Sequence, residues 1–206
     1  FGTTVEEAIS LSNTALFKQD VALAKKVLAN DSEIDRLEVE LEEECLKVLA
    51  LYQPVAADLR FVVAVLKINN DLERIGDLAG NIAKIVSQLT TTGPLKLPEE
   101  ISIMAKQAEE MVKNSLDAVV KADPDLARQV RREDDVVDAG RQAVRELVMQ
   151  RIRKNPEKVE SLLQINSVSK HIERIADMAT NIAEDVIYMV EGEIVRHRHR
   201  DDMKST

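Results

Sequence analysis

The sequence predicts an all-α protein of two tandem, duplicated three-helix bundles with six long helices. Three observations predict this fold: a composition rich in helix-forming residues, two long apolar seams at helical spacing, and an internal repeat. The chain has 206 residues, 45% hydrophobic but only 2% aromatic, with 6 Gly and 5 Pro. Sandwiches and barrels of β-strands favour aromatic residues and frequent Gly and Pro turns, so we expect no such fold.

The charge balance argues against nucleic-acid binding. Lys and Arg number 28 against 37 Asp and Glu, which gives a net charge of −9. Nucleic-acid binders need a basic surface and stacking platforms. The single Cys cannot form an intramolecular disulfide, which is typical of a reducing cytoplasm. Since no stretch of 18 apolar residues and no signal peptide are found, we expect a cytoplasmic chain without a transmembrane segment.

Prolines mark the limits of the predicted helices, because proline is tolerated in the first helical turn but not in the interior. Asp20 and Asp123 each directly precede a predicted helix and are expected to cap it. The predicted helices are Thr4–Gln19, Val21–Leu51, Pro54–Leu89, Pro98–Ala122, Pro124–Lys154 and Pro156–Val190.

Apolar residues recur at alternating spacings of four and three in two of these helices. This spacing is typical of helices that pack along one seam in a bundle. In the third helix the seam comprises Phe61, Val65, Ile68, Leu72, Ile75, Ala79, Ile82, Val86 and Leu89. In the sixth it comprises Ile165, Val168, Ile172, Ile175, Ala179, Ile182, Val186 and Met189.

The two seams belong to an internal duplication. Residues 73–83 align with residues 173–183, and eight of these eleven positions are identical. Upstream, the segment around Asp31 and Asp35 aligns with that around Asp134 and Asp138 at an offset of 103. We therefore divide the chain into a first repeat (1–92), a second repeat (93–191) and a basic C-terminal tail (192–206), with the boundary near residues 90–94.

Polar identities within the repeat predict two metal sites. Glu73, Asp77 and Asn81 recur as Glu173, Asp177 and Asn181 at spacings of four, so each set shares one helix face. Like charges four apart cost a helix roughly 0.2–0.5 kcal/mol per pair, which a bound cation would offset. If each hairpin turns at its proline, the acidic pairs of its two helices lie level. The candidate ligands are Asp31, Asp35, Glu73, Asp77, Asn81, Asp134, Asp138, Glu173, Asp177 and Asn181.

These ligands suit hard cations. Clustered carboxylates without Cys or close His favour Mg, Mn, Ca or Fe(III), and Zn less well. His171 could assist a metal, although a surface histidine is the simpler interpretation. The alternative for the acidic pairs is a solvated face balanced by Arg74 and Arg174. A carboxylate-bridged metal enzyme of the ferritin type would need Glu-x-x-His pairs in the bundle core, and no nucleophile–base set is visible, so we expect no enzyme.

At these motifs the chain resembles the PhoU family. The repeated segments beginning Glu73-Arg74-Ile75 and Glu173-Arg174-Ile175 are similar to the family's E/D-x-x-x-D motifs, and residues 53–60 resemble its first-repeat signature. The turn after Asn155 departs from that signature, so any role of the turn carries over only to the first repeat. The similarity covers essentially the whole chain.

The resemblance implies a function and partners. It implies a metal-binding cytoplasmic regulator of phosphate uptake and a negative regulator of the phosphate-starvation response. The implied partners are the ATPase subunit of the phosphate ABC transporter, a membrane sensor histidine kinase and a second copy in a homodimer, which places the protein beside the inner membrane. Multinuclear metal clusters of Fe, Zn, Mn or Mg at the E/D-x-x-x-D motifs are also implied.

Two alternatives stay open at this point. The chain is also similar to the PhoU-like regulatory domain of other phosphate transporters, such as sodium–phosphate cotransporters. The basic segment 196–200 is either a solvated end or a contact for anionic lipid headgroups or an acidic partner.

Overall fold

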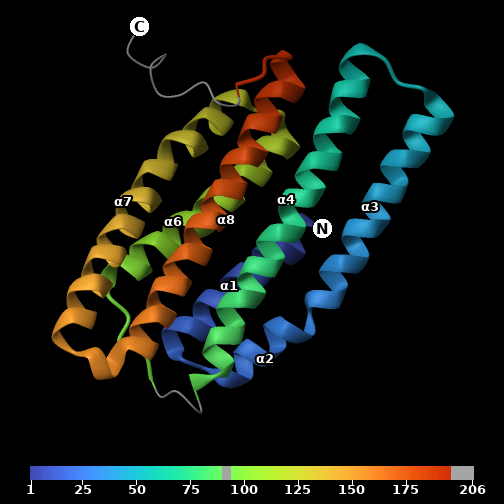
Figure 1. Cartoon of the computed structure of the whole chain (residues 1–206). Helices are drawn as coiled ribbons and strands as arrows, with labels where there is room; N and C mark the ends of the chain where they lie inside the picture. The colour runs from blue at the N-terminus through green and yellow to red at the C-terminus, as the bar shows by residue number, and fades with distance from the viewer. Residues whose placement is uncertain (90–93, 196–206) are drawn as a thin grey trace, which may run out of the picture.

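The computed structural model describes residues 1–89 and 94–195 as a bundle of long helices (Figure 1). The α-helices are α1 (Gly2–Lys18), α2 (Val21–Ala29), α3 (Asp31–Tyr52), α4 (Ala56–Ser87), α6 (Glu99–Lys121), α7 (Pro124–Lys154) and α8 (Val159–Glu191). A short 3₁₀ turn, η1 (Pro156–Lys158), precedes α8. Residues 90–93, where the sequence places the boundary between repeats, and the basic segment from residue 196 onward lie outside the described residues.

The prediction of an all-α fold built from duplicated helices is confirmed, with one correction. The second predicted helix, Val21–Leu51, is broken at Asn30 into α2 and α3. In the second repeat the corresponding helix, α7, is continuous and has Glu133 at the position equivalent to Asn30. Asparagine is a weaker helix former than glutamate, which favours a break in the first repeat rather than in the second.

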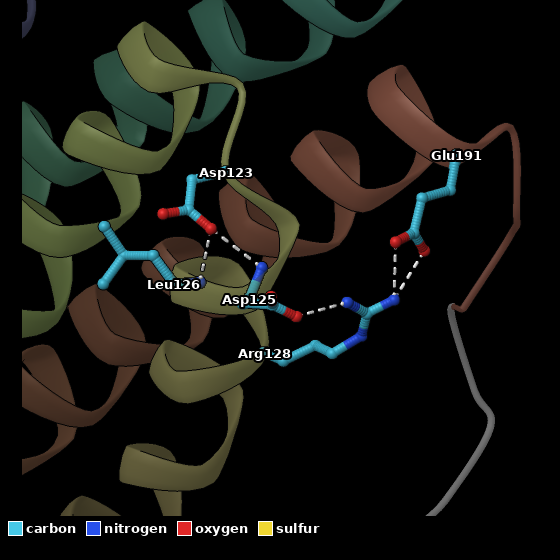
Figure 2. Close-up of polar contacts among 5 residues, drawn as sticks. All are labelled: Asp123, Asp125, Leu126, Arg128 and Glu191. Carbon is cyan, nitrogen blue, oxygen red and sulfur yellow. Dashed lines mark hydrogen bonds and ion pairs between the residues drawn. The ribbon is translucent and has the colours of Figure 1, made fainter.

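Both predicted aspartate caps are present. The Asp20 carboxylate accepts hydrogen bonds from the backbone N–H groups of Ala22 and Leu23 at the start of α2. Asp123 does the same for Asp125 and Leu126 at the start of α7, as Figure 2 shows. Each cap satisfies backbone donors that the first helical turn leaves without an intrahelical partner.

The start of α7 is also tied to the end of α8. Figure 2 shows the Arg128 guanidinium between two carboxylates. It donates to both oxygens of Glu191 at 2.7 and 2.6 Å and to Asp125 at 2.9 Å. Arginine held by two carboxylates in this way fixes the relative position of the two helix ends.

The helices α4 and α8 lie side by side and join the two repeats. In the first repeat α1, α2 and α3 pack on α4, and in the second α6 and α7 pack on α8. The predicted seam of α8 is fully buried, and that of α4 is buried from Ile68 onward. The seam prediction is wrong for Phe61, which is 51% exposed. With 17 residues against 32, α1 covers only part of α4, and the first turns of α4 lie beside α3 and the end of α8, where Arg60 is close to Gly192.

In each repeat a side-chain hydrogen bond joins the two helices of the hairpin and fixes their axial register. Buried Asn69 on α4 donates to the backbone carbonyl of Glu38 on α3 at 2.8 Å. At the equivalent place in the second repeat, Arg141 on α7 donates to Oγ of Ser169 on α8 at 3.2 Å. The equivalent helices, α3 with α4 and α7 with α8, are therefore joined at equivalent positions by hydrogen bonds between different residue types. Within the described ranges, no helix is long and apolar enough to cross a membrane.

Candidate functional site

The first acidic cluster lies between α3 and α4, where the hairpin register predicted it. A Cβ built on Gly80 of α4 would lie 3.8 Å from Oδ1 of Asp31, so this end of α3 faces the Asp77–Asn81 segment of α4. Burial raises the pKa of the Asp31 carboxyl above its ordinary value, and the charges of Asp35 and Asp77 raise it further, while Lys84 opposes them. Three of the predicted ligands are therefore electrostatic neighbours.

Glu73 belongs to the same cluster. Burial raises the pKa of its carboxyl, followed by the charges of Asp77, Glu38 and Asp35, with Arg74 acting in the opposite direction. Glu38 is a carboxylate that sequence reasoning missed, although it follows Asp35 by three residues on the same helix face. Its counterpart in the second repeat is Arg141, so only the first cluster has this additional carboxylate.

The second acidic cluster lies between α7 and α8. Burial raises the pKa of Asp177 to about 6, and the charges of Glu173 and Asp138 contribute, with Arg174 lowering it. Asp134, predicted as a fourth carboxylate here, is half-buried on α7 and is not among the charges that act on Asp177.

The two asparagines and His171 have local contacts. The Asn81 carbonyl accepts from Nζ of Lys84 at 3.3 Å, and the Asn181 amide lies 3.8 Å from the sulfur of Met178. Burial lowers the pKa of His171, and the charges acting on it are those of Arg174 and Lys170 rather than of the cluster carboxylates. None of these contacts is with a cluster carboxylate, so the role of the three side chains as metal ligands stays a prediction.

The carboxylates of each cluster face one another without converging on a point. Among the described residues, no group of three or more His, Cys, Asp or Glu side chains is arranged to hold a metal ion as it stands. The helices bring the donors to one level, and the side chains at the helix surface have rotamer freedom there. Ligation would therefore require rotation of side chains rather than movement of the helices.

The duplicated motif matches a known family. The family model described as "PhoU domain" matches residues 1–86 and again residues 101–186. This chain belongs to the PhoU family. The two matches correspond to the two helical repeats, and each repeat has one acidic cluster.

Relatives in the PhoU family are similar over most of their length. The chain is 42% identical over 195 residues to the "Phosphate-specific transport system accessory protein PhoU homolog" of Aquifex aeolicus, covering 95% of this chain and 88% of that protein. It is 38% identical to the protein of the same name from Pseudomonas aeruginosa, covering 95% and 81% of the two chains.

Solved PhoU structures share the fold. The crystal structure of PhoU from Pseudomonas aeruginosa superimposes with a TM-score of 0.90 at 35% identity, covering 93% of this chain and 92% of that one. The phosphate transport system regulatory protein PhoU from Streptococcus pneumoniae superimposes with a TM-score of 0.87 at 30% identity, with coverage of 94% and 91%.

Proposed function

We propose that this protein is a metal-binding regulator of phosphate uptake and a negative regulator of the phosphate-starvation response. Its relatives from Aquifex aeolicus and Pseudomonas aeruginosa are named accessory proteins of the phosphate-specific transport system, which supports a role beside that transporter. In this proposal the protein is a cytoplasmic homodimer without catalytic activity. It acts by contact with the ATPase subunit of the phosphate ABC transporter and with a membrane sensor histidine kinase.

The observation that carries the metal part of this proposal is the duplicated level register of carboxylates. In each repeat, burial and neighbouring like charges raise the pKa of at least one carboxyl, so the free clusters are electrostatically unfavourable. The donors fit a hard cation because they are all carboxylate or amide oxygens. Asp31, Asp35, Glu73 and Asp77, with Asn81, would hold the ions of the first site.

The second site would use the equivalent set from α7 and α8. The residues are Asp134, Asp138, Glu173, Asp177 and Asn181. A bound ion of Fe, Zn, Mn or Mg would neutralise the cluster and link the two helices. Since the ligands lie at the helix surfaces, the ion would alter the outer surface that a partner protein contacts. We infer that the protein acts as a switch in this way.

Metal content of the purified protein tests the first site. We expect inductively coupled plasma mass spectrometry to show that Glu73→Ala/Asp77→Ala loses the metal of that site. The control is Glu42→Ala/Glu43→Ala, which removes two exposed carboxylates from α3 outside the cluster. Equal metal content in the wild type and the Glu73/Asp77 variant would contradict the metal assignment.

Capture of the transporter ATPase by the same three proteins tests the switch separately. We expect the Glu73→Ala/Asp77→Ala variant to retain less ATPase than the wild type and the Glu42→Ala/Glu43→Ala control. If the variant loses its metal yet captures the ATPase normally, the metal is not the switch. If none of the proteins captures the ATPase, the proposed partner is wrong.

A further inference from the structure

An open groove is lined by residues of α7 and α8 and extends from the second acidic cluster towards the hairpin turn. It encloses about 840 Å³. Asp138 and Glu173 line it at the end nearest the cluster, and Arg153 lines it near the turn. Along its length the lining includes the basic side chains of Arg141, Arg145, Arg153 and Lys170. Four of the ten lining residues are basic and three, Asp138, Glu146 and Glu173, are acidic, so the groove is slightly basic although the chain as a whole is acidic.

Three of these cations lack an internal partner. Arg145, Arg153 and Lys170 are exposed and make no hydrogen bond or ion pair within the described part of the chain. Glu146, an acidic residue that also lines the groove, accepts instead from the amide of Gln142 at 3.1 Å. Elsewhere on α7 an arginine does have carboxylate partners, as Arg128 shows (Figure 2).

The basic residues of the groove can be compared with the residues at the equivalent positions of the first repeat. The positions equivalent to Arg141, Arg145, Arg153 and Lys170 are Glu38, Glu42, Ala50 and Asn70. Four basic side chains in the second repeat thus replace two acidic and two neutral ones on the same helical frame. A favourable interaction with the helix dipole accounts for basic residues in the last turn of α7, such as Arg153, but falls off before Arg145. Helix formation alone does not explain this reversal of charge.

We propose that this groove docks an acidic amphipathic helix of a protein partner. The interval from Arg141 to Arg145 is about 6 Å along the helix axis and that from Arg145 to Arg153 about 12 Å, at 1.5 Å per residue. Carboxylates four and eight residues apart on a partner helix repeat at the same intervals. Arginine binds carboxylates in two-pronged hydrogen bonds, which favours a peptide carboxylate as the ligand.

An apolar side chain completes the surface. Met149 lines the groove and is 50% exposed, among the basic residues. Methionine adapts to irregular apolar surfaces, so it suits a leucine or valine on the docked helix. The inference rests on the proposed function in that a regulator acting by protein contact needs such a surface. It does not depend on metal, because the unpaired cations lie outside the acidic cluster.

The probe is a fluorescein-labelled, helix-forming synthetic peptide with Glu at every fourth position and Leu on the adjoining face. Its reference is the same peptide with Gln for each Glu. Fluorescence anisotropy is measured at about 0.15 M salt, where charges more than about 8 Å apart are largely screened, and with EDTA so that metal plays no part. We expect Arg145→Glu/Arg153→Glu to weaken binding of the Glu peptide by about tenfold or more, since like charges then face each other.

The matched control is Arg132→Glu/Arg151→Glu, which makes the same charge change at exposed α7 positions outside the groove. We expect it to bind within about twofold of the wild type, because distant surface charges are screened. Equal weakening in both variants would overturn the proposal in favour of general charge attraction. Absence of wild-type binding, equal binding of the Gln peptide, or full displacement by millimolar inorganic phosphate would also overturn it.

Circular dichroism and thermal melting establish that both variants are folded before binding is compared. The docking inference and the proposed function fail in different ways. Loss of peptide binding with metal uptake intact contradicts only the docking surface. Peptide binding without metal uptake or ATPase capture contradicts only the proposed regulatory mechanism.

Discussion

Gly76 on α4 lies so close to Ile34 on α3 that a Cβ at this position would be 2.8 Å from Cδ1 of Ile34. Ile34 is buried, and Gly76 lies one residue before the cluster carboxylate Asp77. In the second repeat the equivalent pair is Ala176 and Val137. Ala176 has one methyl group more than Gly76, and Val137 has one carbon fewer than Ile34. The close contact between helices is thus retained at similar total volume.

This pair predicts a coupled effect of two substitutions. Gly76→Ala should lower the free energy of unfolding by about 1–3 kcal/mol, because the new methyl group overpacks the interface. Adding Ile34→Val should restore most of that loss, as in the second repeat. Gly80→Ala is the control, since its Cβ would have ordinary van der Waals space and should add about 0.5–1 kcal/mol through helix propensity. Urea unfolding of the wild type, Gly76→Ala, Ile34→Val, the double variant and Gly80→Ala measures the coupling, and additive effects of Gly76→Ala and Ile34→Val would contradict it.

A second prediction concerns the contact between the repeats. Lys67 on α4 lies 3.4 Å from the carboxylate of Asp185 on α8, which is 1% exposed, and 5.1 Å from the ring centre of Tyr188. Lys67→Met should lower the free energy of unfolding by about 1–3 kcal/mol, because a buried carboxylate loses a cationic partner. Lys106→Met, at an exposed position of α6, should change it by less than about 0.5 kcal/mol. Similar losses in both variants would refute a specific role of the pair.

The raised pKa of Asp177 predicts a dependence of stability on pH in metal-free buffer. Because the folded-state pKa, about 6, exceeds the ordinary value of 3.8, the folded protein binds this proton more tightly than the unfolded chain. The contribution of Asp177 to the free energy of unfolding is therefore greatest below about pH 4 and is lost as the pH rises through about 6. Asp177→Asn should be about 1–2 kcal/mol more stable than the wild type at pH 7.5 and similar to it at pH 4. Urea titrations at both pH values test this, and a pH-independent difference would contradict it.

The first cluster predicts opposite effects of one variant with and without metal. Glu73→Gln/Asp77→Asn removes two like charges, so it should melt higher than the wild type in EDTA at pH 7.5. With saturating Mn²⁺ the wild type should gain several degrees, since a ligand that binds only the folded state stabilises it, while the variant gains less. Differential scanning calorimetry measures both conditions. An equal Mn²⁺-induced shift in the two proteins would place the ion elsewhere.

Much of the fold could be predicted because helical periodicity and duplication are local properties of the sequence. The seam of α8, the two aspartate caps and the levels of Asp31 with Asp77 and of Asp138 with Glu173 all follow from spacing. The level register could be inferred because two antiparallel helices joined by a short turn leave little freedom along their axes.

Other features depend on tertiary packing. Phe61 is exposed in the first turns of α4, and its own seam spacing does not reveal this. The break at Asn30 was visible only as a weak cap signal before the acidic first turn of α3. Glu38 enters the first cluster because α3 turns it towards Glu73, while its equivalent is an arginine, so the duplication gave no sign of it.

The pairing of α4 with α8 has a consequence for how the fused chain assembles. The antiparallel register that places Lys67 beside Asp185 also places Ile85 of α4 level with Ser167 of α8. Ser167 is the repeat equivalent of Lys67, and Ile85 is that of Asp185. The symmetry-related position therefore has no ion pair. Pairing α4 with another α4 would bring Lys67 to an isoleucine, and pairing α8 with another α8 would bury Asp185 against a serine. We expect this asymmetric ion pair to favour pairing of the unlike repeats over self-association of either one.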